Sequence, residues 1–144
     1  MIDLHAHILP GLDDGPASLE DSVAMARVAS AAGTRALATT PHVDHRFGLS
    51  PADLAAAREA LARRIAEAGI ELELLAGGEV APERLADLDD DDLRHLTLGG
   101  GPYVLLECPL SPGGGGLDVM VADLRRRGFG VLLGHPERSP ALIR

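Results

Sequence analysis

The chain has 144 residues, of which 46% are hydrophobic and 24% charged, a composition typical of one globular domain rather than a disordered segment. Its net charge of −9 argues against binding to nucleic acid and against insertion into an anionic membrane, because both surfaces repel an acidic protein. All 13 basic residues are arginine, which excludes lysine chemistry such as a Walker A loop or a Schiff base. The single cysteine and the lack of a basic, apolar leader predict a cytoplasmic protein.

The spacing of apolar residues alternates along the chain between strand-like and helix-like periods. It predicts five strands, at residues 2–8, 35–40, 71–75, 103–106 and 130–133. Between them it predicts helices from Ser18 to Gly33, from Pro51 to Gly69, as a turn or two broken by an acidic run within 83–96, and from Leu117 to Arg127. Alternating strands and helices are typical of an α/β domain with a parallel sheet, here spanning residues 1–144.

A histidine or a glutamate stands at the C-terminal end of every predicted strand. These residues are His5, His7, His42, Glu79, Glu107 and His135. Because the C-terminal ends of parallel strands meet at one edge of a sheet, we expect one shared site there. His5 and His7 point to the same face of their strand, and imidazole with carboxylate suits Zn, Mn or Fe. Asp13 and Asp14 follow the first strand and could add an oxygen ligand.

Each of these residues has a simpler interpretation when taken alone. A His-x-His pair is often incidental, and a lone histidine at a strand end is more often a surface residue. Glu107 is harder to dismiss, because it follows the apolar run 104–106, where an unpaired carboxylate is costly. Acidic residues and histidines occupy 28 of 144 positions (22 plus 6), so five strand ends out of five are improbable by chance. His45 is expected at the rim, and His95 on a solvated acidic face.

The opening residues 1–15 resemble those of the bacterial tyrosine-protein phosphatases that regulate capsule and exopolysaccharide synthesis, members of the PHP (polymerase and histidinol phosphatase) superfamily. The Leu-Pro-Gly-x-Asp-Asp-Gly segment within them is distinctive in that superfamily. Further motifs match in the same order along the whole chain: Thr40-Pro41-His42, Gly78-Glu79-Val80, Glu107-Cys108-Pro109 and His135-Pro136-Glu137-Arg138.

The resemblance implies a distorted seven-stranded β/α barrel with up to three divalent metal ions, commonly manganese, with iron or zinc as other candidates. The metal ligands that it implies are His5, His7, Asp14, His42, Glu79, Glu107 and His135. It implies that Arg138 holds the substrate phosphate, for which a planar guanidinium is well suited. The implied reaction is hydrolysis of phosphotyrosine, by a water that the metals activate, on a cytoplasmic tyrosine kinase of polysaccharide synthesis or its partners.

Other functions would use similar residues. A PHP phosphatase for a small molecule, of the histidinol phosphate type, would carry the same ligands. An amidohydrolase also has His-x-His on a barrel strand, although many bridge their metals with a modified lysine, which this chain lacks. A metal-binding fragment without catalysis is the remaining alternative.

The family also carries an Asp-x-His motif near its end, which has no counterpart here. We therefore expect a C-terminally truncated domain, a partial PHP-type barrel with about five of the seven strands and weakened metal binding. The first and last strands would then be unpaired edges. Ser139-Pro140 predicts the start of a helix, with serine as cap and proline in the first turn.

Overall fold

The computed structural model describes residues 1–109, 116–140 and 142. Its strands are β1 (Ile2–Ala6), β2 (Ala36–Thr39), β3 (His42–Val43), β4 (Glu73–Leu75), β5 (Glu79–Val80), β6 (Tyr103–Glu107) and β7 (Gly130–Gly134). Its α-helices are α1 (Leu19–Ala31), α2 (Pro51–Glu67), α3 (Asp90–Leu96) and α4 (Leu117–Arg126). Short 3₁₀ turns are η1 (Pro82–Arg84), η2 (Leu98–Gly100) and η3 (Pro136–Arg138).

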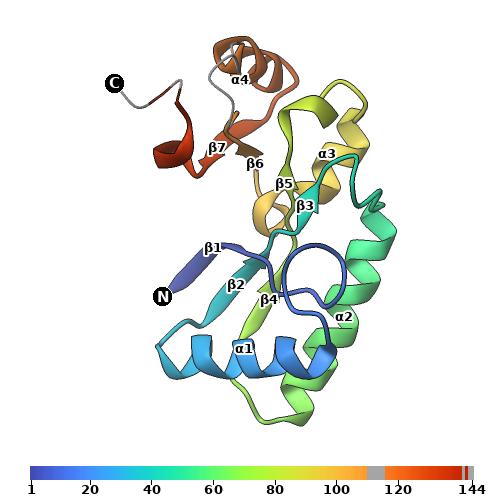
Figure 1. Ribbon diagram of the computed structural model, residues 1–144, viewed down its shortest axis with the longest axis vertical. Coiled ribbons are helices and arrows are strands. Elements are labelled where there is room, and N and C mark those ends of the chain that lie inside the picture. The colour runs from blue at the N-terminus through green and yellow to red at the C-terminus, as the bar shows by residue number, and fades with distance from the viewer. Residues whose placement is uncertain (110–115, 141, 143–144) are drawn as a thin grey trace.

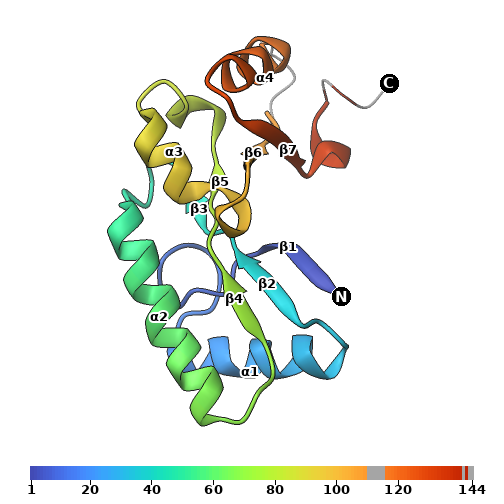
Figure 2. The same cartoon turned by 180° about the vertical axis from the view of Figure 1, so that it is seen from behind.

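The strands form two parallel sheets, which confirms the α/β class with parallel strands. One sheet has the order β1-β2-β4 and the other the order β3-β5-β6-β7. Figure 1 shows the first sheet with α1 and α2 in the lower half of the molecule, and the second with α3 and α4 in the upper half. The reverse view in Figure 2 shows the same division. In the described part of the chain, β1 and β7 are both edge strands.

Two of the predicted strands, at 35–40 and 71–75, are each followed by a second, short strand that was not predicted. The chain passes from β2 in the first sheet to β3 in the second, and again from β4 to β5. Pro41 lies at the first crossing and has no N–H for a sheet ladder. Gly78 lies at the second, where a Cβ would approach Leu96 Cδ2 to 2.8 Å. His42 and Glu79 therefore begin a strand rather than end one, which corrects the prediction for these two residues.

Side-chain caps define the helix starts. Ser18 accepts a hydrogen bond from the Asp21 amide, and Ser50 forms a reciprocal capping box with Asp53. The acidic run at 89–92 was predicted to break a helix, but it begins α3 instead. Asp89 and Asp92 cap each other's amides, and the negative charges lie at the positive end of the helix dipole.

The described residues do not include a helix starting at Ser139, although residues 141, 143 and 144 lie outside them. Ser139 instead ends η3, and its buried hydroxyl donates to the Pro109 carbonyl at 2.8 Å. The hydroxyl thus joins the segment after β7 to the segment after β6.

The core is aliphatic, as a chain with two Phe, one Tyr and no Trp requires. Its largest fully buried apolar side chains are Ile8, Leu9, Leu37, Leu61, Ile65, Leu93, Leu96, Leu105, Leu106, Leu124 and Val80. A fully buried glutamate, Glu79, stands among them. No helix in the described part of the chain is long and apolar enough to cross a membrane.

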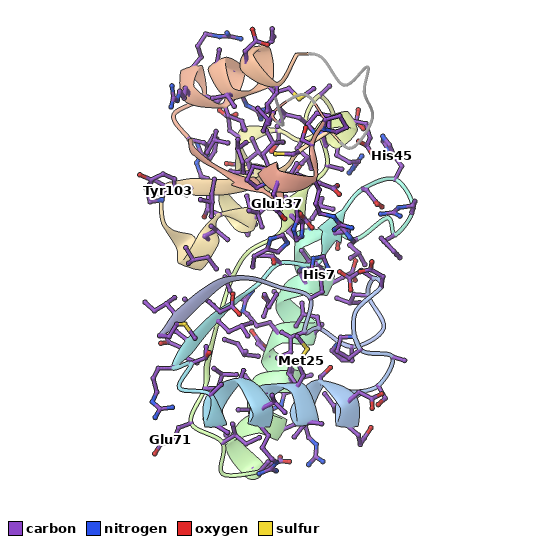
Figure 3. The ribbon with its side chains drawn as sticks, turned by 60° about the vertical axis from the view of Figure 1, so that its left-hand side comes forward. His7, Met25, His45, Glu71, Tyr103 and Glu137 are labelled. Carbon is purple, nitrogen blue, oxygen red and sulfur yellow. The ribbon has the colours of Figure 1, made fainter. Side chains whose placement is uncertain are left out.

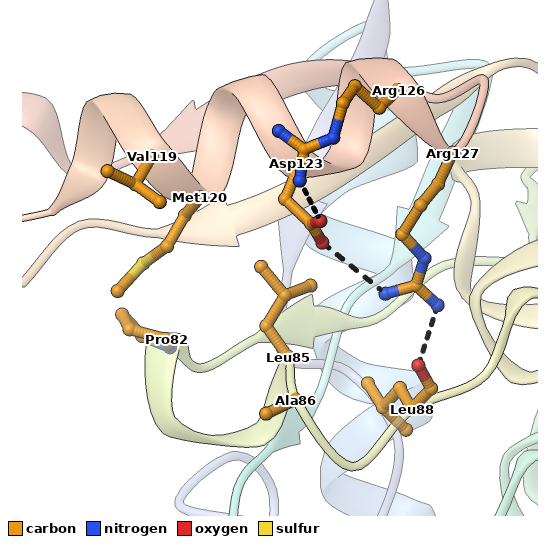
Figure 4. A pocket seen from close by; sticks show the side chains of 9 residues that line it. All are labelled: Pro82, Leu85, Ala86, Leu88, Val119, Met120, Asp123, Arg126 and Arg127. Carbon is orange, nitrogen blue, oxygen red and sulfur yellow. Dashed lines mark hydrogen bonds and ion pairs between the residues drawn. The ribbon is translucent and has the colours of Figure 1, made fainter.

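Helix α4 packs against residues 82–88, with a pocket between them that is lined mainly by apolar side chains (Figure 4). Arg127 closes one side, where its Nη2 donates to the Leu88 carbonyl at 2.6 Å and its Nε to Asp90 Oδ1 at 2.7 Å. None of the histidines or glutamates singled out in the sequence lines this pocket. The contacts of Arg127 thus join the end of α4 to the start of α3.

Candidate metal centre

Three imidazoles converge on the buried carboxylate of Glu79. Its Oε2 lies 3.3 Å from His5 Nε2, 3.2 Å from His7 Nε2 and 3.2 Å from His42 Nδ1. Among the described residues, neither oxygen of Glu79 has a well-directed hydrogen bond. Ligand atoms of His5, His7 and Glu79 all lie within 4.8 Å of one another. Close nitrogen and oxygen atoms without directed hydrogen bonds suit a set of donors around a cation. Figure 3 shows His7 between the two halves of the molecule.

A second group of donors adjoins the first. It consists of His7, Asp14 and His42, whose ligand atoms also lie within 4.8 Å of one another. Asp14 Oδ1 is 3.6 Å from His7 Nδ1 and 3.7 Å from His42 Nε2, and the Asp14 side chain is 72% exposed. Because His7 and His42 contact both Glu79 and Asp14, the two groups could hold neighbouring ions.

Asp13 has a different position from Asp14, which the sequence did not distinguish. Its side chain is shielded from solvent, and its Oδ2 lies 2.6 Å from His7 Nδ1 and accepts the His42 amide at 3.0 Å. Its Oδ1 accepts the Gly15 amide at 2.9 Å. A carboxylate on one ring nitrogen fixes the orientation of an imidazole and leaves the other nitrogen for a metal. Asp13 therefore orients His7.

Glu107 and His135 approach the same centre from β6 and β7. Glu107 is the last residue of β6, half-buried, and its pKa is raised by burial and by the charge of Glu79. His135 directly follows β7, and its ring centroid is 4.8 Å from that of His5. Its φ of 47° is the only positive φ of a non-glycine residue in the described chain. Such a backbone costs free energy and is often found at functional sites.

Arg138 lies three residues after His135, in η3. Its amide donates to the His135 carbonyl at 2.9 Å, and its side chain is exposed. Among the described residues, its guanidinium forms no ion pair with a carboxylate. The head group of Arg138 therefore remains available to a ligand.

The charges of the centre shift two pKa values strongly. Burial works to lower the pKa of His7, but the contacts and charges of Asp13 and Glu79 outweigh it and raise that pKa from 6.5 to about 10. Burial works to raise the pKa of Glu79, but His5 and His7 outweigh it and lower that pKa from 4.5 to about 2. Without a metal ion, His7 is therefore protonated at neutral pH and Glu79 is ionised.

Imidazoles and carboxylates gathered where parallel strands meet define a candidate metal site of the kind found in metal-dependent hydrolases. The whole chain, residues 1–144, matches the family model described as capsular polysaccharide synthesis, CpsB/CapC. The chain belongs to this family.

Individual relatives agree with the family match. The chain is 35% identical over 142 residues to tyrosine-protein phosphatase YwqE of Bacillus subtilis, covering 96% of the chain and 55% of that protein. It is 27% identical to tyrosine-protein phosphatase CpsB of Streptococcus agalactiae, covering 99% of the chain and 59% of CpsB. The chain thus spans somewhat more than half the length of these relatives.

A solved structure is also similar. It comes from work on YwqE of Bacillus subtilis and CpsB of Streptococcus pneumoniae, described as unique metal-dependent tyrosine phosphatases. The match has a TM-score of 0.84 and 32% identity, and it covers 99% of this chain and 58% of that one.

Metal uptake should release the proton on His7 Nε2, the nitrogen that faces Glu79, while Asp13 keeps the proton on Nδ1. A metal ion needs the neutral imidazole, and because the pKa of His7 is about 10, uptake at pH 7 should expel about one proton from this residue. Asp13→Asn removes the charge and lowers this pKa, so fewer protons should be released. Calorimetric titration with Mn²⁺ in two buffers of different ionisation enthalpy counts them. Asp87→Asn, on the surface, is the control, and equal proton counts for Asp13→Asn and wild type would contradict the assignment.

Gly134 should be required for the geometry around Glu79. A Cβ at this position would lie 2.7 Å from Glu79 Oε1, closer than side chains tolerate. We expect Gly134→Ala to weaken Mn²⁺ binding about tenfold or more, because displaced donors lose their shared geometry. Calorimetry measures the affinity, and thermal unfolding shows whether β7 remains intact. Leu132→Ala on the same strand controls for general damage to β7. Wild-type affinity in Gly134→Ala would show that Glu79 is free to move.

Proposed function

We propose that this chain carries the metal centre of a metal-dependent phosphatase that hydrolyses phosphotyrosine in proteins. The observation that carries the proposal is the convergence of His5, His7 and His42 on the buried carboxylate of Glu79. The family match and the tyrosine phosphatases among the relatives support the reaction class.

The proposed fold is a PHP-type barrel, of which these residues contribute five passes of the chain. The metal ions are proposed to be Mn²⁺, up to three in a complete barrel. The proposed ligands are His5, His7, Asp14, His42, Glu79, Glu107 and His135. Their mixture of imidazole nitrogen and carboxylate oxygen suits Mn²⁺ and also Fe or Zn. The two adjoining donor groups support more than one ion.

The protein's own residues would prepare the site for phosphate. Divalent cations bound there would supply a nucleophilic water at neutral pH and polarise the phosphoryl group. Asp13 holds the ring of His7 with one nitrogen directed to Glu79. Arg138 would bind phosphoryl oxygens through its planar guanidinium. His135, fixed in a left-handed backbone, would bring a nitrogen to the side of His5.

The proposed substrate is a phosphotyrosine on a tyrosine kinase of polysaccharide synthesis, in the cytoplasm. The family description refers to capsular polysaccharide synthesis, and its relatives are named tyrosine-protein phosphatases. The net charge of −9 is consistent with a protein that does not bind nucleic acid.

The reaction is tested by metal-dependent turnover. With added Mn²⁺, the chain should hydrolyse p-nitrophenyl phosphate and a phosphotyrosine peptide, but not a phosphoserine peptide, and a chelator should abolish the activity. Glu107→Gln should reduce the bound metal, measured by elemental analysis, without changing thermal unfolding. Metal binding without any turnover would favour a binding module. Preference for histidinol phosphate over the phosphotyrosine peptide would favour a small-molecule phosphatase.

Arg138 is tested by a change that keeps its charge. Arg138→Lys should raise the inhibition constant of inorganic phosphate about tenfold, because a point charge does not replace a bidentate fork. Arg94→Lys, an exposed arginine on α3, is the control. If phosphate inhibited wild type and Arg138→Lys equally, Arg138 would be no more than a surface residue.

A further inference from the structure

A buried carboxylate organises the loop that follows β3. Asp44 is only 3% exposed, and its Oδ1 accepts the amides of Arg46 at 2.8 Å and Phe47 at 3.2 Å. Its Oδ2 accepts the Arg46 Nε–H at 2.5 Å and lies 2.5 Å from Nη2. Burial works to raise the pKa of Asp44, but the contacts with Arg46 and the two amides outweigh it and lower that pKa. The loop is therefore built around one fixed negative charge.

This charge holds the guanidinium of Arg46, although the side chain is 68% exposed. The guanidinium carbon also lies 5.1 Å from the centroid of the Phe47 ring, a cation–π distance. Phe47 in turn stacks on the imidazole of His42, with an interplanar angle of 7° and centroids 6.3 Å apart. The ring of Phe47 thus links His42, a proposed metal ligand, to the guanidinium of Arg46, which Asp44 holds in place.

The setting of Arg46 differs from that of the other exposed arginines. Arg64, Arg94 and Arg126 each pair with a carboxylate three residues away on the surface of a helix. Arg46 instead pairs with the buried Asp44, and the ring of Phe47 links it to His42 of the metal centre. Its Nη1 contacts no acceptor in the described part of the chain. This amino group is available to a ligand, on the loop directly after β3, the strand that carries His42.

We propose that Arg46 binds phosphoryl oxygens of the substrate at the metal centre, and that Asp44 is the positioning residue that holds it there. The inference rests on the proposed function and adds a second arginine to Arg138. Free N–H groups of a guanidinium bind phosphate strongly. A side chain that is already held loses little freedom on binding. In a chain with a net charge of −9, a cation on this loop also offsets the repulsion of an incoming phosphate.

The experiment measures the binding of inorganic phosphate to the Mn²⁺-loaded chain by calorimetry, so it does not depend on turnover. Arg46→Ala should weaken phosphate binding about tenfold or more, as expected for the loss of a hydrogen bond to a charged group. Arg46→Lys should have an intermediate effect, and the Mn²⁺ affinity without phosphate should not change. Arg94→Ala, where the arginine is 61% exposed, is the matched control and should bind phosphate like wild type.

Asp44→Asn tests the positioning role in a double-mutant cycle. As a single substitution, Asp44→Asn should weaken phosphate binding. Added to Arg46→Ala, it should cause no further loss of phosphate affinity, because Asp44 acts through Arg46. Additive losses would overturn the positioning role. If Arg46→Ala does not fold, Arg46→Lys carries the test, since lysine can keep the pair with Asp44 but not the planar fork.

Phosphate affinity of folded Arg46 variants equal to that of wild type would overturn the proposal, as would the absence of phosphate binding by wild type. The Michaelis constant for p-nitrophenyl phosphate should rise together with the dissociation constant of phosphate, which extends the result from free phosphate to a phosphomonoester. A wild type that binds phosphate through Arg46 but has no turnover would refute the proposed function and leave this inference standing.

Discussion

The carboxylate of Glu79 is the constraint on which the rest of the structure depends. It is fully buried, and an ionised group without water costs several kcal/mol unless opposite charges face it. His5, His7 and His42 face it within 3.3 Å, the first two from the end of β1 and the third from β3. The charge is therefore stable only when β1, β3 and β5 are in their native arrangement. The proposed metal ions would supply the same positive charge more strongly.

The junction between the two sheets provides the space for this arrangement. The chain crosses from one sheet to the other at Pro41 and at Gly77-Gly78, directly before His42 and Glu79. A side chain at Gly78 would collide with Leu96, and one at Gly134 with Glu79 itself. Glycine, which lacks a side chain, and proline, which lacks an amide hydrogen, thus interrupt the strands at the point where the proposed metal ligands meet. The site therefore depends on the passage of the chain between the two sheets as well as on the proposed ligands themselves.

Two other carboxylates stabilise the surroundings of the centre in the same way. Asp13 and Asp44 each combine hydrogen bonds from two backbone amides with a contact to one side chain of the proposed site. Asp13 thereby fixes the ring of His7, and Asp44 fixes the guanidinium of Arg46. Each side chain is held before any ligand arrives, which reduces the entropy lost on binding. The loops after β1 and β3 therefore belong to the proposed site.

The sequence by itself determined the alternation of strands and helices and the residues that approach Glu79, because these depend on local spacing and residue type. It did not reveal the short strands β3 and β5, the start of α3 in the acidic run, or the turn at Ser139. It also treated Asp13 and Asp14 alike and did not single out Asp44 or Arg46. Only the tertiary structure decided these points. The packing of distant backbone segments decides which carboxylate oxygen faces which ring and whether that carboxylate is buried. Adjacent residues in one loop, such as Asp13 and Asp14, can therefore have opposite surroundings.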